Sequence, residues 1–218
     1  MGDKILIIGE SGSGKSRAAK SLDPATTFFI NCIGKPLPFK GWKGKFNKEA
    51  GNYTVKTQAS EVVKVLEHID KEMPQIKTVL IDDAQYIMSY EFMYRAMEKG
   101  FDKFTEIGRN FFNVLTAPDN MREDLLVIYL AHADNTGDRV KIKTIGKMLD
   151  DKITLEGMFT VVLMAYSYNE DKEMKYVFVT QSNGTNTCKS PEGMFSATAI
   201  DNDLAKVVEL YHKYQMEE

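Results

Sequence analysis

Short runs of consecutive apolar residues recur along the chain and are separated by polar segments or by segments with helical periodicity. Such runs are typical of strands that are buried on both faces of a parallel sheet. Residues 61–73 place apolar side chains at helical spacing and end before a proline. The alternation predicts an α/β fold with a mostly parallel central sheet flanked by helices. Its strands are expected at residues 5–8, 26–31, 78–81 and 125–131.

The last third of the chain has a different pattern. Two further apolar segments, at residues 159–165 and 175–180, are joined by a short turn-like stretch, which predicts an antiparallel hairpin at one edge of the sheet. Residues 89–115 are expected to be mostly helical, and residues 202–214 to form a terminal amphipathic helix. A chain of 218 residues is long enough to bury one proper core, so we expect a single domain over residues 1–218.

The segment after the first apolar run carries a specific chemical pattern, G-x-x-x-x-G-K-[ST], between a predicted strand and helix-forming residues. Glycines let successive backbone N–H groups turn around a phosphate, and the start of a helix adds positive potential. The lysine can reach the β- and γ-phosphates of a nucleotide, and the final hydroxyl can ligate Mg²⁺. A Gly/Ser-rich turn is the alternative, but the complete pattern favours binding of a nucleoside triphosphate. The segment comprises Gly9, Glu10, Ser11, Gly12, Ser13, Gly14, Lys15 and Ser16.

Polar residues follow two of the predicted strands. Asp82 and Asp83 stand at the end of strand 78–81, in the form of a Walker B element, with Asp82 as the magnesium carboxylate. Asp83 is predicted to orient or deprotonate the attacking water, with capping of the next helix as the alternative. His132 ends strand 125–131, where polar groups face the ligand crevice of an open α/β sheet. It is predicted to sense the γ-phosphate, although a lone histidine is often only structural.

Two basic segments are candidate nucleic-acid contacts. The segment after His132 carries Arg139, Lys141, Lys143 and Lys147 with two glycines, which predicts a mobile loop switched by nucleotide state. Nearby aspartates dilute its charge, and a solvated charged face is the alternative. Residues 35–46 interleave lysines with three aromatic residues, a composition suited to gripping phosphate and stacking bases. A solvated loop whose aromatics fold back onto the body is equally compatible with this second segment.

The order of these features resembles the RecA-like recombinase core, and most closely small phage-encoded ATP-binding proteins that include single-strand annealing ATPases. The resemblance spans nearly the whole chain and implies ATP and Mg²⁺ as ligands, with the nucleotide at a subunit interface of a ring or filament. It implies that Lys189 reaches the γ-phosphate of a neighbouring subunit, and that Lys141 to Lys147 match a DNA-binding loop. One departure matters: residues 31–34 offer no carboxylate where RecA-type enzymes carry a catalytic glutamate. The resemblance therefore implies slow, DNA-stimulated hydrolysis.

Composition narrows these expectations only slightly. A net charge of −3 gives no general argument for nucleic-acid binding, so that argument rests on local patches. Two cysteines form no metal-like cluster, and no apolar run approaches a membrane span, so a cytoplasmic setting, the host cytoplasm for a phage protein, is expected. The expected function is an ATPase that binds single-stranded DNA and promotes annealing or recombination, with a single-strand binding protein as a further partner. A helicase-loading motor and an ATP-binding module with negligible hydrolysis are the alternatives.

Overall fold

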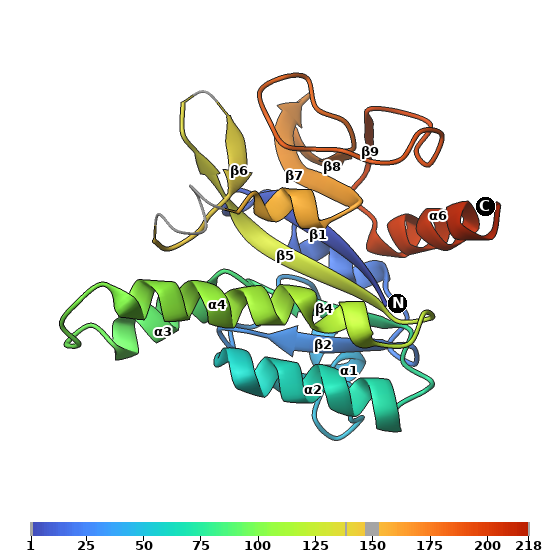
Figure 1. The fold of residues 1–218 in the computed structure, drawn as a ribbon. Coiled ribbons are helices and arrows are strands. Elements are labelled where there is room, and N and C mark those ends of the chain that lie inside the picture. Colours follow the sequence, from blue (N-terminus) through green and yellow to red (C-terminus); the bar gives the residue numbers. More distant parts are fainter. Residues whose placement is uncertain (1, 138, 147–152, 218) are drawn as a thin grey trace.

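The computed structural model describes residues 2–137, 139–146 and 153–217 of the chain. A mostly parallel sheet lies at its centre, with helices on both faces (Figure 1). Neighbouring strands follow the order β3-β2-β4-β5-β1-β7-β8-β9, and β6 pairs with β5 alone. The strands are β1 (Asp3–Gly9), β2 (Thr27–Asn31), β3 (Tyr53–Val55), β4 (Thr78–Asp82), β5 (Leu126–Asn135), β6 (Val140–Ile142), β7 (Val161–Glu170), β8 (Glu173–Val179) and β9 (Ala199–Asp201). The mixed α/β architecture predicted from the sequence is confirmed.

The helices separate into two groups by the sheet face that they cover. Helices α2, α3 and α4 contribute to the core cluster that contains Leu6 and Ile8, whereas η1 and α6 contribute to the cluster that contains Ile5 and Ile7. All four of these β1 side chains are 0% exposed, because β1 is covered on both faces. The helices are η1 (Ser16–Ser21), α1 (Trp42–Lys45), α2 (Ala59–Glu72), α3 (Tyr86–Tyr94), α4 (Asp102–Thr116), η2 (Ala117–Asn120), η3 (Leu155–Met158) and α6 (Leu204–Glu217).

The predicted hairpin is confirmed at the edge of the sheet. Strands β7 and β8 pair in antiparallel fashion from Met164 opposite Val179 to Glu170 opposite Glu173. The two residues between them, Asp171 and Lys172, have φ angles of 51° and 67°. Two consecutive positive φ values are typical of the tight turn that matches the twist of a two-stranded hairpin. Strand β9 then adds to β8, so that the antiparallel part continues the parallel sheet.

One element differs from its predicted form. The helix after the phosphate-binding loop is a six-residue 3₁₀ helix, and Leu22 is already extended. Pro24 disfavours helical backbone at the preceding residue, so the helix has no room to lengthen. The region 89–115, expected to be mostly helical, is so, and its helices are α3 and α4, between which Gly100 has a φ of +93°. Among the described residues, no helix is long and apolar enough to cross a membrane.

The end of α4 depends on a tyrosine from β5. Pro118 stands four residues after Val114 and has no N–H to donate to the Val114 carbonyl. The Tyr129 hydroxyl donates to that carbonyl at 2.7 Å instead, and the Tyr129 side chain is 0% exposed. The hydrogen bond joins the helix layer to β5, the strand that carries His132.

We expect Tyr129→Phe to lower the free energy of unfolding by about 1–3 kcal/mol, because the buried Val114 carbonyl then loses a partner. Denaturant unfolding measures this change. Tyr168→Phe is the matched control, since Tyr168 lies on β7 and is 38% exposed. Equal stability of both variants would contradict a structural role for the Tyr129 hydroxyl.

Candidate functional site

The parallel register of the sheet brings the predicted site residues to one edge. Gly9 at the end of β1 pairs with His132 on β5, and Asn31 at the end of β2 pairs with Asp82 on β4. Because β5 lies between β1 and β4, His132 is placed between the phosphate-binding loop and the two aspartates. A cavity of about 370 Å³ opens at this edge, and Lys15, Asp83 and His132 are among its lining residues.

The phosphate-binding loop has backbone geometry that requires glycine. Gly12 and Gly14 have φ angles of +82° and +96°, which residues with a Cβ rarely adopt. A Cβ on Gly9 would lie 2.6 Å from Ser13 Oγ and 2.7 Å from the Ala165 carbonyl oxygen. The loop can therefore curl tightly only with these residues, as the sequence pattern predicted.

Lys15 points back into the loop. Its Nζ donates to the carbonyl oxygens of Gly9 at 2.7 Å and Glu10 at 2.8 Å. Burial lowers the pKa of Lys15 to about 8, against the opposing charges of Asp83 and Asp82. The ammonium thus rests on neutral carbonyls inside the loop, where a phosphate would be a stronger acceptor.

Ser16 and Asp82 form a site suited to a magnesium ion. The Ser16 hydroxyl donates to Asp82 Oδ1 at 2.7 Å, and the other carboxylate oxygen, Oδ2, is buried without a hydrogen-bond partner among the described residues. Burial and the neighbouring Asp83 charge raise the pKa of Asp82 to about 6. A hydroxyl and a carboxylate with a free buried oxygen are hard ligands of the kind that Mg²⁺ prefers, so both residues fit the predicted role.

Asp83 is held more tightly than the sequence suggests. Lys35 forms an ion pair with Asp83 Oδ2, and His132 Nε2 lies 3.3 Å from Oδ1. Burial favours the neutral acid, but hydrogen bonds from His132 and Lys35 dominate and lower the pKa of Asp83. Its φ is +61°, an uncommon backbone conformation for a residue with a Cβ. The predicted base is therefore an ionised carboxylate fixed between two side chains.

Gln85 anchors His132 in this arrangement. The His132 backbone N–H donates to Gln85 Oε1 at 3.0 Å, and the imidazole packs edge-on against Tyr86 with ring centroids 5.9 Å apart. Strand β5 does not end at His132 but continues to Asn135. The candidate sensor is thus embedded in a continuous strand.

Sequence reasoning missed several lining residues. Lys35 was assigned to the basic aromatic segment, yet it lies on Asp83 in the same cavity as the phosphate-binding loop. The position of Lys35 just after β2 could have identified it as a site residue, because RecA-type enzymes carry their catalytic glutamate close to that position. Arg17 lines the cavity too, but it follows the loop motif without being part of the pattern, and only the fold brings Tyr176 on β8 to the loop.

The basic segment after His132 is only partly the loop that we expected. Val140 to Ile142 form β6, which pairs with β5 and places Lys141 opposite Asp134. Arg139 Nε donates to the Asn186 carbonyl at 3.2 Å, and Lys143 is exposed. Part of the predicted basic loop is therefore a short strand paired with β5, whereas Arg139 and Lys143 lie in irregular backbone on either side of it. Lys147 lies outside the described residues.

Residues 35–46 fold back onto the body instead of presenting a row of aromatic side chains. Phe46 is 0% exposed and packs against Phe29 with ring centroids 5.3 Å apart. Trp42 packs against Tyr53 at 5.9 Å. The alternative of a loop with inward-folded aromatics is therefore confirmed.

Lys189 lies away from the phosphate-binding loop of its own chain. It forms backbone hydrogen bonds with Val162 in both directions, at 2.8 and 2.9 Å. Val162 pairs with Leu6 in the first half of β1, whereas the loop follows the other end of that strand. A contact with a nucleotide bound to a neighbouring subunit stays a prediction.

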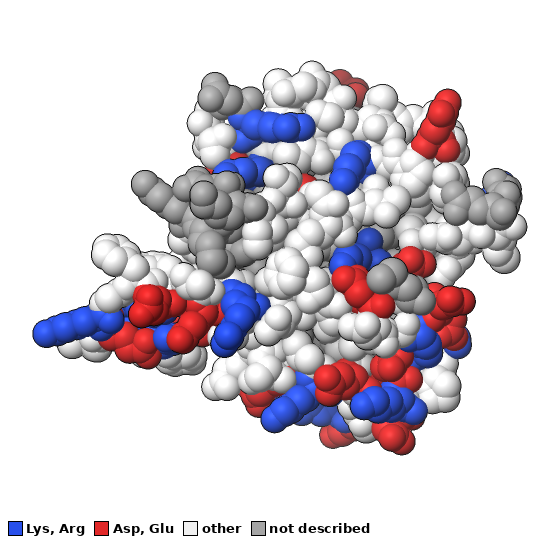
Figure 2. Space-filling view, viewed as in Figure 1, with Lys and Arg blue, Asp and Glu red and all other residues white. Residues whose placement is uncertain are grey.

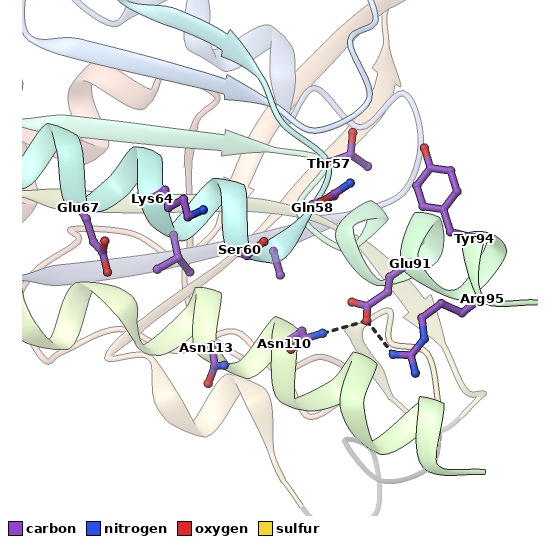
Figure 3. Close-up of a pocket in the computed structure, with 12 residues that line it drawn as sticks. Thr57, Gln58, Ser60, Lys64, Glu67, Glu91, Tyr94, Arg95, Asn110 and Asn113 are labelled. Carbon is purple, nitrogen blue, oxygen red and sulfur yellow. Dashed lines mark hydrogen bonds and ion pairs between the residues drawn. The ribbon is translucent and has the colours of Figure 1, made fainter. Parts of the chain in front are cut away.

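A larger cavity of about 600 Å³ lies between α2, α3 and α4 (Figure 3). Its charged groups face one another: Glu91 Oε1 accepts from Asn110 at 2.8 Å and from Arg95 at 3.1 Å (Figure 3). No residue of the phosphate-binding loop lines it. Despite its size, this cavity lacks the phosphate-binding groups found at the carboxyl ends of the strands.

Comparisons with known proteins identify the fold and the family of this chain. A crystal structure of a KaiC-like protein from the hyperthermophilic archaeon Pyrococcus horikoshii has a TM-score of 0.51 at 14% sequence identity, covering 81% of this chain and 78% of that one. At that identity the match establishes a RecA/KaiC-like fold alone. No curated protein matches the chain. The model of the AAA domain family matches residues 1–191, which include the phosphate-binding loop, Asp82 and His132, so the chain belongs to this family of P-loop nucleoside-triphosphate-binding domains.

Proposed function

We propose that this protein is a slow ATPase that binds single-stranded DNA and promotes annealing or recombination. One observation carries the proposal: His132, which pairs with Gly9, is followed on the same strand by residues 133–135, which pair with β6 and its Lys141. We call this β5–β6 pair the ribbon. Because β5 is one continuous strand, it connects His132 to the ribbon stiffly. A change at the phosphate-binding loop therefore has a short path to the basic residues.

The site residues have separate roles in this proposal. Lys15 leaves its carbonyl partners for the β- and γ-phosphates, and Ser16 and Asp82 hold Mg²⁺, which would neutralise charge on the phosphates. Asp83 accepts a proton from the attacking water, and His132 responds to the γ-phosphate through its contact with that carboxylate. Proton transfer requires that Asp83 be freed from Lys35, and this requirement supports slow turnover.

The ribbon supplies the proposed contact with DNA. Arg139, Lys141 and Lys143 lie on or beside β6, and Lys147 follows in the sequence. Figure 2 shows several separate blue side chains in the upper half of the view, whereas acidic and basic side chains intermingle over the helices in the lower part. A local cluster can bind phosphates although the whole chain has a net charge of −3.

A homo-oligomer completes the proposal, with the nucleotide at a subunit interface and Lys189 of one subunit directed at the γ-phosphate held by the next. A ring and a filament both satisfy this arrangement. A positive charge supplied across an interface stabilises the transition state only in the assembled form. Assembly on DNA would then increase hydrolysis, and a single-strand binding protein would be a competing or loading partner.

A second candidate is a nucleotide-gated ATP-binding module with negligible hydrolysis. The Lys35–Asp83 ion pair favours it, because a carboxylate with a lowered pKa is a weak base. Single-turnover hydrolysis separates the two candidates. The proposed ATPase releases phosphate faster when single-stranded DNA is present, whereas the gated binder does not.

We expect Asp83→Asn to retain Mg·ATP binding and to slow hydrolysis by about 10²–10⁴-fold, because an amide cannot accept the proton of the attacking water. Calorimetry and phosphate release measure the two effects. Asp134→Asn is the matched control on β5, two residues beyond His132. Unchanged turnover in Asp83→Asn would assign the base to another residue.

We expect Lys15→Ala to weaken ATP binding by on the order of 2–3 kcal/mol or more, because a charge-assisted phosphate contact is lost. Lys189→Ala should bind ATP as an isolated subunit but lose DNA-stimulated hydrolysis. A mixture of the two variants should regain part of the activity, because some interfaces pair an intact Lys15 with an intact Lys189. No recovery in a mixture shown to co-assemble would exclude the role in trans.

We expect hydrolysis to increase with single-stranded DNA, and a Lys141→Ala/Lys143→Ala variant to lose this stimulation. The slope of log affinity against log salt should fall by roughly one unit per lost phosphate contact. A Lys64→Ala/Lys71→Ala variant on α2 removes the same charge and is the control. If both double variants bind DNA as the unaltered chain does, the contact lies elsewhere.

A further inference from the structure

One end of the phosphate-loop cavity is formed by an arginine and a tyrosine that have no assigned role. The guanidinium carbon of Arg17 lies 4.5 Å from the centroid of the Tyr176 ring, in a cation–π arrangement. Both residues line the cavity of about 370 Å³, together with Gly14, Lys15 and Ser16. Among the described residues, no carboxylate forms an ion pair with Arg17, so its interaction with the Tyr176 ring is not shared with an acidic side chain.

The position of the tyrosine is set by the phosphate-binding loop itself. A Cβ on Gly14 would lie 2.7 Å from Tyr176 Cδ1, so the ring packs directly on the loop backbone. The same hypothetical Cβ on Gly14 would lie 3.1 and 3.3 Å from the side-chain amide of Asn202, a residue that is only 6% exposed. Tyr176 is therefore held at a fixed place relative to any phosphate in the loop.

The order of the strands indicates how a bound nucleotide would be oriented in the cavity. His132 and Asp83 lie on the β5 and β4 side of β1, and Tyr176 lies on the β7 and β8 side. Lys15 and Ser16 lie between these groups, and Arg17 is the next residue along the chain. With the γ-phosphate at Asp83 and His132, the nucleoside end points toward Arg17 and Tyr176.

We propose that Arg17 and Tyr176 form the platform on which the nucleobase stacks. The proposal rests on nucleotide binding at the proposed site but not on DNA binding. A guanidinium stacked on an aromatic ring leaves its other flat face for a base, and such stacking uses a surface that every base has. The platform therefore holds adenine and guanine alike, and selection between them requires contacts to the base edges.

The test compares ATP with inorganic tripolyphosphate, both with Mg²⁺, by calorimetry. Tyr176→Leu keeps apolar packing on Gly14 but removes the aromatic face. We expect it to weaken ATP and GTP binding about tenfold and to leave tripolyphosphate binding unchanged. Tyr176→Phe should bind ATP nearly as the unaltered chain does. Tyr168→Leu, on the neighbouring strand β7, is the matched control and should have no effect.

Two results would overturn the platform. If Tyr176→Leu weakens ATP and tripolyphosphate binding equally, the ring only supports the loop. If Tyr176→Leu leaves ATP binding unchanged and Pro38→Ala weakens ATP binding, the base stacks on Pro38 instead, which lines the same cavity. Selective loss of ATP binding without any DNA stimulation of hydrolysis would support the platform and reject the proposed DNA function.

Discussion

Two adjacent carboxylates buried at the end of β4 impose the constraint on which the site depends. Asp82 is 0% exposed and Asp83 is 1% exposed, and burying two like charges side by side is costly without partners. Each acid meets a different set of groups: Ser16 donates to Asp82, whereas Lys35 and His132 hold Asp83. Three segments must therefore meet at the end of β4: the phosphate-binding loop, the loop after β2 and the part of β5 that carries His132.

The same constraint explains how the site can respond to a nucleotide. Lys15 rests on backbone carbonyls and Lys35 rests on Asp83, so both cations already have protein partners. Phosphate oxygens compete for the same cations, and charge-assisted hydrogen bonds to phosphate are stronger than those to carbonyls. Binding would thus exchange internal contacts for contacts with the ligand. His132 would be affected by that exchange, because it contacts Asp83 as Lys35 does. It lies on β5, which continues to the residues that pair with β6.

The hairpin at the sheet edge links the site to the last part of the chain. Tyr176 on β8 lies against Gly14 of the phosphate-binding loop, and so does Asn202 just after β9, although the family model ends at residue 191. Strand β9 pairs with β8 and leads into α6, whose cluster includes Leu204 and residues of η1. The C-terminal segment therefore supports the loop as well as covering one face of the sheet.

The sequence alone was enough to predict the α/β class, the central parallel strands and the meeting of Lys15, Ser16 and Asp82 at one site, because buried strands and the loop pattern depend on local residue order. It did not reveal that Lys35 holds Asp83, that Tyr176 packs on Gly14 or that β5 continues past His132. The first two contacts join residues that are 48 and 162 positions apart in the sequence, and only the fold brings them together. Only the tertiary structure could decide them, since pairing across a sheet leaves no pattern in the neighbouring sequence.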